Sequence, residues 1–201
     1  MKSETRISVL ISGGGTNFQS IIDAAEAGEL LNAKIVQVIA SKADAYGLER
    51  GKKHGIPTKV ISKAEYPDMK ERMAAVLKAL DDEKTDLVVL AGYLSILAPE
   101  IIKAYEGRII NIHPSLLPKF GGKDCYGIHV HEKVVAAGEK ESGATVHFVD
   151  EGIDTGKIII QGKVEVQADD TPEDLQKRVL VQEHRILPEA IRMVIKEKGG
   201  L

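Results

Sequence analysis

Short apolar runs alternate along this chain with segments whose apolar residues recur at helical spacing, and this alternation restricts the fold more than any other feature. A connection between parallel strands usually contains a helix. Alternating strands and helices therefore predict an α/β fold, with a Rossmann-like, mostly parallel sheet flanked by helices. Strands are expected at Ile7–Ile11, Lys34–Ala40, Leu87–Ala91 and Arg108–Ile112, and helices at Phe18–Ala27 and Met69–Leu80.

The pattern changes after residue 142. Two β-rich runs, Ala144–Val149 and Lys157–Val166, are joined by the turn Asp150–Gly156. This arrangement predicts an antiparallel strand addition in the C-terminal half of the chain. The sequence has no internal repeat or linker, and its length suits one domain, so residues 1–201 are expected to form a single domain.

Composition excludes several classes of protein. Hydrophobic residues make up 43% and charged residues 28%, as in ordinary globular proteins. The formal net charge of -3 gives no basic face for nucleic acid. The single cysteine rules out an internal disulfide framework. No signal peptide or long apolar span is present, so we expect a cytoplasmic protein with no membrane partner.

A glycine-rich turn, Ser12–Asn17, follows the first predicted strand. Glycines let the backbone approach a ligand closely, and free N–H groups at a helix start attract an anion. The turn lacks the Gly-Lys-Ser/Thr ending of a P-loop, and Phe18 occupies the third glycine position of a dinucleotide fingerprint. We therefore favour a monophosphate site. The alternative is a tight turn in which Thr16 or Asn17 caps the helix.

Two polar residues, Asn111 and His113, end the fourth predicted strand. Alternate residues of a strand point to the same side, so the amide and the imidazole are expected side by side. An amide can donate to a developing oxyanion, and an imidazole can carry a proton near neutral pH. The alternative is that both merely satisfy a turn at Pro114.

The last helical segment carries an acid on its apolar side. Thr171 and Pro172 have the residue types of a helix start. Glu183 lies near the centre of an apolar stripe, where a carboxylate is costly unless something binds it. It is expected either to bind a ligand hydroxyl or amine or to pair with a Lys or Arg. Pro188 is expected to kink or end this helix near residues 184–187. The stripe consists of Leu175, Val179, Ile186, Leu187, Ala190 and Val194.

The remaining candidate residues give weaker signals. His129 and His131 have no Cys or acid at metal-ligand spacing, so no metal is expected and both are interpreted as structural or surface residues. Cys125 has no sequence signature of a reactive thiol. His147 is interpreted as a packed or supporting residue within a strand.

Several motifs together resemble the formyltransferase family that uses 10-formyltetrahydrofolate. The resemblance covers nearly the whole chain, and within the family it is greatest to the members that formylate glycinamide ribonucleotide in de novo purine biosynthesis. The motifs are Asn111–Pro118, Gly143–Asp150 and Asp154–Gly156, with Ile11–Asn17, Ser41–Glu49, Leu90–Leu94 and Gln182–His184 as further matches.

The resemblance implies a transfer of the formyl group from the folate nitrogen to a primary amine. Asn111 and a protonated His113 would stabilise the oxygen of the tetrahedral intermediate, and Asp154 would hold His113 in the required charge state and assist proton transfer. The implied co-substrate is 10-formyltetrahydrofolate, without a metal. The implied partners are small-molecule substrates, and the protein is expected to be a monomer or homodimer.

The same resemblance implies two substrate sites. Gly15, Thr16 and Asn17 would bind the phosphate of the ribonucleotide, and Glu183 would bind its ribose or amine end. The pterin would be enclosed by Leu94, Ser95, Ile96, Leu97, Val149 and Asp150.

Two stretches depart from the family pattern. Phe120–His131 is longer than the loop that many members have there. Met69 stands where the family often has an arginine associated with the glutamate tail of folate, so Lys70 or Arg72 would have to substitute.

Three other functions remain open at this stage. A formyltetrahydrofolate hydrolase usually has a regulatory domain and a second His where Pro114 stands. A methionyl-tRNA formyltransferase would need a C-terminal domain and a basic surface. In a nucleotide-binding module without catalysis, the glycine turn would bind phosphate while Asn111 and His113 were structural.

Overall fold

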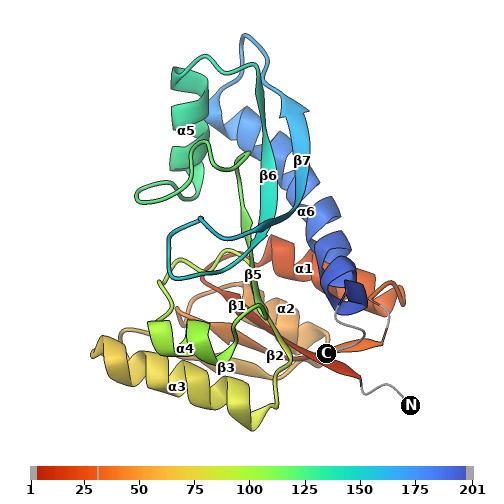
Figure 1. Cartoon of the computed structure of the whole chain (residues 1–201), viewed down its shortest axis with the longest axis vertical. Helices are drawn as coiled ribbons and strands as arrows, with labels where there is room; N and C mark the ends of the chain where they lie inside the picture. The colour runs from red at the N-terminus through yellow and green to blue at the C-terminus, as the bar shows by residue number, and fades with distance from the viewer. Residues whose placement is uncertain (1–3, 31, 198–201) are drawn as a thin grey trace.

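Seven strands form one mixed sheet, in the order β3-β2-β1-β4-β5-β6-β7, in a computed structural model that describes residues 4–30 and 32–197 (Figure 1). The first five strands in the chain pair in parallel, while β6 and β7 add to β5 in antiparallel fashion. Both predictions, the Rossmann-like parallel sheet and its antiparallel addition, are confirmed. The strands are β1 (Thr5–Ile11), β2 (Ala33–Ala40), β3 (Thr58–Val60), β4 (Leu87–Leu90), β5 (Ile109–His113), β6 (Glu141–Phe148) and β7 (Ile158–Glu165).

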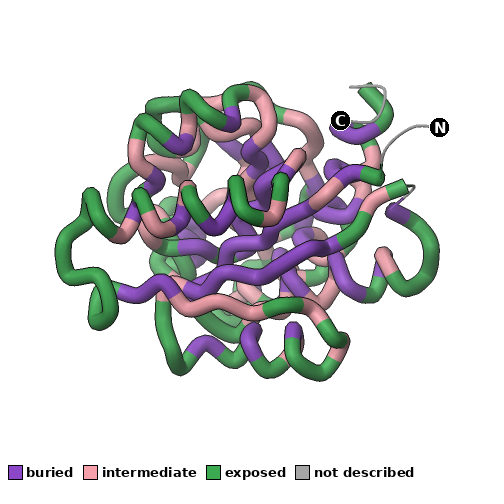
Figure 2. The backbone as a smooth tube through the Cα atoms, turned by 90° about the horizontal axis from the view of Figure 1, so that it is seen from below, coloured by how far each residue is buried: buried purple, intermediate pink, exposed green. Residues whose placement is uncertain are grey.

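Helices cover both faces of the sheet. One apolar cluster joins the sheet to α1, α2, α5 and α6, through residues such as Phe18, Val130 and Leu187. A second cluster joins the opposite face to α3 and α4, through Val76 and Ile101. Figure 2 shows the buried strands running through the middle, with exposed segments on the outside. The helices are α1 (Thr16–Glu26), α2 (Gly47–Lys53), α3 (Met69–Asp82), α4 (Pro99–Ala104), α5 (Ile128–Ala136) and α6 (Pro172–Glu197).

The α6 helix starts as expected but does not end as expected. The Thr171 hydroxyl accepts from Asp174 N–H at 3.2 Å, and the Asp174 carboxylate accepts from the Thr171 hydroxyl at 2.7 Å. Pro188 lies inside the helix, which continues to Glu197, so of the two expected outcomes, a kink or an end near residues 184–187, the end is wrong. Pro188 is buried against the core and apolar residues beyond it are also buried. This burial offsets the missing N–H of the proline.

The strand order reverses direction at β1, which has β2 on one side and β4 on the other. Ligands of open α/β sheets bind where the order reverses, beyond the carboxyl ends of the strands. In this protein, side-chain hydrogen bonds connect the residues that follow the carboxyl ends of β1, β2 and β4. The Ser12 hydroxyl, after β1, accepts from Leu94 N–H at 2.8 Å and bonds the Ser41 hydroxyl at 2.6 Å. The glycine turn and the segment after β4 are therefore neighbours at this edge.

Candidate active site

Asn111 and His113 are held on one face of the sheet by β6. Asn111 pairs with His147, and His113 pairs with Thr145, in the antiparallel register between β5 and β6. On the other side, Asn111 pairs with Leu90 at the end of β4. Paired residues on neighbouring strands point to the same face, so these polar side chains gather at the end of β5.

Asp154 reaches this cluster from the turn between β6 and β7. Its carboxylate lies 3.4 Å from His113 Nδ1 and 3.5 Å from His147 Nε2, and it accepts from Gly122 N–H at 3.0 Å. Burial acts to raise the pKa of Asp154, but the His147 hydrogen bond, the His113 charge and the Gly122 N–H together hold it below its usual range. The structure thus brings the three predicted catalytic residues together around an ionised carboxylate.

His113 lies between the Phe120 carbonyl and the Asp154 carboxylate. Burial lowers its pKa, and this effect outweighs the opposing influence of Asp154 and of the Phe120 carbonyl. Its Nε2 lies 2.9 Å from the Phe120 carbonyl oxygen. A carbonyl can only accept, so Nε2 carries the proton and Nδ1 faces Asp154.

His147 is a member of the cluster that sequence reasoning treated only as packed or supporting. Its Nδ1 lies 2.8 Å from the Phe148 carbonyl, so Nδ1 donates, while its Nε2 faces the Asp154 carboxylate. Asn111 Nδ2 lies 3.2 Å from that Nε2. His147 therefore fixes the orientation of the Asn111 amide, whose second N–H is left for a ligand. The strand register that creates this contact is not readable from residue order.

Two further residues missed by sequence reasoning support the chain just after His113. The Thr145 hydroxyl donates to the Ser115 carbonyl at 2.6 Å and accepts from Leu117 N–H at 3.1 Å. Gln161 Nε2 donates to the Leu117 carbonyl at 3.0 Å and to the Thr145 hydroxyl at 2.9 Å. These bonds hold the backbone that leads away from the imidazole.

The glycine turn presents backbone N–H groups at the start of α1. Gly15, with φ 69°, precedes α1 as its cap residue, and no side chain caps the helix, so neither Thr16 nor Asn17 has the capping role. Within residues 4–30 and 32–197, no acceptor takes the N–H of Gly14, Gly15 or Thr16. Free N–H groups at a helix start are what a phosphate requires.

Asn17 and Glu183 join this turn to α6. Asn17 Nδ2 donates to Glu183 Oε2 at 2.5 Å, and Glu183 is only 8% exposed. Burial raises the pKa of Glu183, with the Asn17 bond acting in the opposite direction. The partner is thus an amide and not the Lys or Arg considered from sequence. Asn17 Oδ1 is buried without a partner among the described residues, and a ligand donor would satisfy it.

The segment expected to bind folate is partly exposed. Leu94 is 57% and Ile96 63% exposed, whereas Leu97 is buried in the cluster beneath α3 and α4. Val149 packs against the same cluster. Ser95 is half-buried, and Asp150 is exposed and accepts from the Thr155 hydroxyl at 2.6 Å. Leu94 and Ile96 thus offer uncovered apolar surface in the segment after β4, whose last residue, Leu90, pairs with Asn111.

The other titratable residues do not form a metal site. Among residues 4–30 and 32–197, no three His, Cys, Asp or Glu side chains are grouped to hold a metal ion. His131 is buried and His129 is exposed on α5. Cys125 is free and lies 3.2 Å from Lys133 Nζ. None of the helices described is long and apolar enough to cross a membrane.

Comparison with known proteins gives concordant matches. The family model described as formyl transferase matches residues 5–191. A protein of Haemophilus influenzae named phosphoribosylglycinamide formyltransferase is 44% identical over 187 residues, which cover 93% of this chain and 85% of the relative. A chloroplastic phosphoribosylglycinamide formyltransferase of Arabidopsis thaliana is 41% identical over 194 residues, 96% of this chain.

Some of these relatives are longer than this chain. It spans 66% of the Arabidopsis protein and 14% of an insect protein named as a trifunctional purine biosynthetic protein. Among solved structures, glycinamide ribonucleotide transformylase 1 from Symbiobacterium toebii superposes with a TM-score of 0.90 at 43% identity. The match covers 96% of this chain and 88% of that structure.

Proposed function

Because this chain belongs to the formyl transferase family, we propose that it transfers the formyl group of 10-formyltetrahydrofolate to the primary amine of glycinamide ribonucleotide. This reaction is a step of de novo purine biosynthesis. The finer expectations belong to the same proposal: one formyltransferase domain, acting in the cytoplasm as a monomer or homodimer.

One observation carries the proposal: Asn111, His113 and Asp154 converge at the end of β5, with the glycine turn at the same edge of the sheet. Acyl transfer needs donors for an oxyanion and a group that moves protons. The cluster offers both. A non-catalytic nucleotide-binding module would need only the glycine turn and would have no use for a buried carboxylate between two histidines.

In the proposed reaction the neutral amine attacks the formyl carbon, and the carbonyl oxygen becomes an oxyanion. The free N–H of Asn111 donates to that oxygen, and in this proposal the Nε2–H of His113 exchanges its acceptor at rest, the Phe120 carbonyl, for the oxyanion. One such donor contributes about 3 kcal/mol to transition-state stabilisation. Burial lowers the pKa of His113, and the developing negative charge acts in the opposite direction and favours protonation of its imidazole.

Asp154 completes the reaction in this proposal. As the bond between the formyl carbon and the folate nitrogen breaks, the proton lost by the amine passes to that nitrogen. The ionised carboxylate is placed to relay it, directly or through water, and it stabilises the imidazolium of His113. General acid–base assistance of this kind is worth about 10²–10⁴ in rate.

The ribonucleotide is proposed to lie between the glycine turn and α6. The N–H groups of Gly15, Thr16 and Asn17 bind the phosphate at the start of α1. Glu183 and the unpartnered Asn17 Oδ1 accept from the ribose hydroxyls or the amine. This arrangement accounts for the buried acid on the apolar stripe of α6.

The folate is proposed to cover the segment after β4. The pterin would pack on Leu94 and Ile96, with Ser95, Val149 and Asp150 at its margin and Leu97 supporting the segment from the core. The fit rests on uncovered apolar side chains in the segment that follows β4, the strand beside Asn111, since large exposed apolar groups gathered at one site usually mark a binding surface.

The test is to incubate the protein with 10-formyltetrahydrofolate, with and without glycinamide ribonucleotide, and to follow release of tetrahydrofolate. Release that depends on the ribonucleotide supports the proposal. Release that is independent of it indicates a hydrolase, and no turnover with retained nucleotide binding indicates the non-catalytic module. Either of the last two results overturns the proposal.

A further inference from the structure

The α2 helix packs directly beneath the glycine turn. Gly47 N–H, at the start of α2, donates to the Gly13 carbonyl at 3.1 Å. A Cβ atom on Gly15 would lie 2.7 Å from the Gly47 Cα, and one on Gly47 would lie 2.3 Å from the Ile11 side chain. The two backbones therefore touch, and α2 is placed to control the conformation of the turn.

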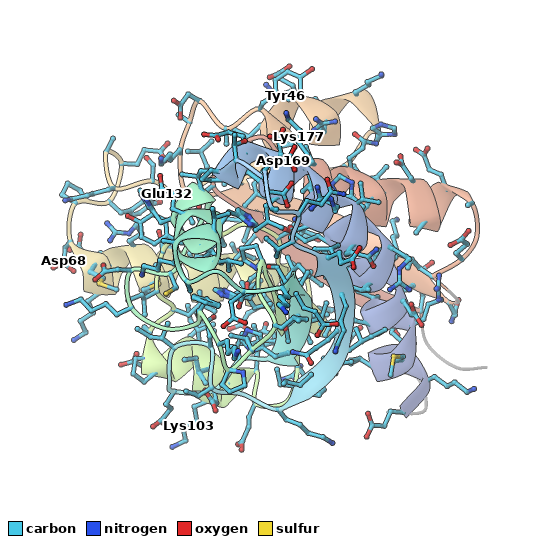
Figure 3. The ribbon with its side chains drawn as sticks, turned by 90° about the horizontal axis from the view of Figure 1, so that it is seen from above. Tyr46, Asp68, Lys103, Glu132, Asp169 and Lys177 are labelled. Atoms are coloured by element: carbon cyan, nitrogen blue, oxygen red, sulfur yellow. The ribbon has the colours of Figure 1, made fainter. Side chains whose placement is uncertain are left out.

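Arg50 makes the second contact between α2 and the turn. Its Nε donates to the Gly14 carbonyl at 2.9 Å, and its Nη1 donates to the Gln19 side-chain oxygen of α1 at 3.1 Å. The guanidinium carbon lies 5.2 Å from the centre of the Tyr46 ring. Tyr46 is 61% exposed and lies at the outer edge of the molecule in Figure 3. One planar fork thus connects the turn, α1 and α2.

A hydrogen bond to the carbonyl of one residue also fixes the direction of the N–H of the next residue. A peptide unit is planar and trans, so the C=O of one residue and the N–H of the next point in opposite directions. The bond to the Gly14 carbonyl therefore directs Gly15 N–H away from Arg50. The bond from Gly47 to the Gly13 carbonyl directs Gly14 N–H in the same way.

The third peptide of the turn is fixed by the helix itself. Gln19 N–H donates to the Gly15 carbonyl at 2.9 Å, which directs Thr16 N–H. Three successive carbonyls are thus held on the side of α1 and α2, while the three following N–H groups are free within the described residues. Of the groups that hold these carbonyls, only Arg50 is a side chain.

We propose that Arg50 is a positioning residue for ribonucleotide binding, which sets the direction of Gly15 N–H by holding the Gly14 carbonyl. It acts through the backbone and does not touch the ligand. This inference rests on the proposed function, because it assumes that the phosphate of the ribonucleotide binds to the N–H groups of the turn.

The geometry distinguishes positioning from a simple effect of positive charge. An ammonium group on a lysine stem keeps the charge, but it lacks the planar fork that bonds Gly14 and Gln19 together. Arg50→Lys is therefore expected to lose most of the effect, and Arg50→Met all of it. Lys52→Met is the matched control, because Lys52 lies on the same helix, has 60% of its side chain exposed and, among the residues that the structure describes, pairs through its side chain only with Glu49.

The experiment measures the dissociation constant of glycinamide ribonucleotide by calorimetry, together with kcat and both KM values. For Arg50→Met we expect the dissociation constant and KM for the ribonucleotide to rise about tenfold, because the variant loses one charge-assisted hydrogen bond. KM for 10-formyltetrahydrofolate and kcat should stay within about twofold of the unmodified protein. Arg50→Lys should resemble Arg50→Met, and Lys52→Met should resemble the unmodified protein.

Three results would overturn the inference. Unchanged ribonucleotide affinity in Arg50→Met shows that the contact does not matter, and full affinity in Arg50→Lys shows that only charge matters. If Arg50→Met raises both KM values equally and also lowers the unfolding temperature, the role of Arg50 is merely structural. Failure of the unmodified protein to bind the ribonucleotide is a separate outcome, which contradicts the proposed function itself.

Discussion

The buried histidine of α5 should make the fold sensitive to acid. His131 is 1% exposed, and its Nδ1 has no hydrogen-bond partner among the described residues. Burial lowers its pKa from 6.5 to about 4, with the nearby His113 charge as a second cause. The folded state therefore excludes a proton that the unfolded chain binds below pH 6.5.

The size and sign of the effect follow from these two values. A group with a lowered pKa contributes full stability above its unfolded pKa, and the contribution falls as the pH drops toward the folded value. One pKa unit corresponds to 1.36 kcal/mol. Between pH 7 and pH 4, titration of His131 alone should lower the free energy of unfolding by about 3 kcal/mol.

The assay is urea unfolding followed by circular dichroism at pH 7 and pH 4, for the unmodified protein and for His131→Leu. Leucine has a similar volume and removes the unpartnered nitrogen, so stability at pH 7 should be equal or slightly higher. The loss of stability between pH 7 and pH 4 should be smaller in the variant by about 3 kcal/mol. His129→Leu, which removes an exposed histidine from the same helix, is the control. Equal pH dependence in His131→Leu and the unmodified protein would refute the reasoning.

Two further changes test how the site is supported. Gln161→Leu removes both hydrogen bonds that reach Leu117 and Thr145, so the free energy of unfolding should fall by about 2–3 kcal/mol in urea titrations, and kcat should fall because the chain after His113 is less restrained. An unchanged kcat would show that this network does not position the imidazole. Glu183→Gln should raise the free energy of unfolding at pH 7. The pKa of Glu183 is raised in the folded state, so its contribution to stability is lost as the pH rises through that folded-state pKa, and glutamine has no charge to bury. The same variant should weaken binding of the ribonucleotide in calorimetry, and unchanged affinity would return Glu183 to a structural role.

Much of the sheet could be predicted because buried parallel strands are continuous apolar runs. The run Ile7–Ile11 lies within β1, and the helix expected at Met69–Leu80 matches α3 to within two residues. The shorter elements were missed. The β3 strand has three residues and α4 has six, too few to show a period. Pro188 misled the prediction of α6, since the propensity of one residue was outweighed by the packing of a long apolar stripe.

The candidate site was predictable where a residue was out of place locally. Glu183 stood out as an acid on an apolar stripe, and Asn111 and His113 as polar residues ending an apolar strand. The family resemblance supplied Asp154 as the partner of His113, but the partners of Glu183 and Asn111 were not predictable. Asn17 lies 166 positions from Glu183, and His147 lies 36 positions from Asn111. Such contacts depend on strand register and helix packing, which residue order does not contain. Arg50 was missed for the same reason, since it bonds to a glycine carbonyl and belongs to no motif.

The central claim is that Asn111, His113 and Asp154 transfer a formyl group to the amine of the ribonucleotide. The most direct measurement is the ribonucleotide-dependent release of tetrahydrofolate by the unmodified protein and by Asp154→Asn, each saturated with 10-formyltetrahydrofolate. Asparagine keeps the shape of the side chain but removes the charge between His113 and His147. The account predicts that the rate falls by at least about 10²-fold while folate binding is largely retained. A rate close to that of the unmodified protein would contradict it.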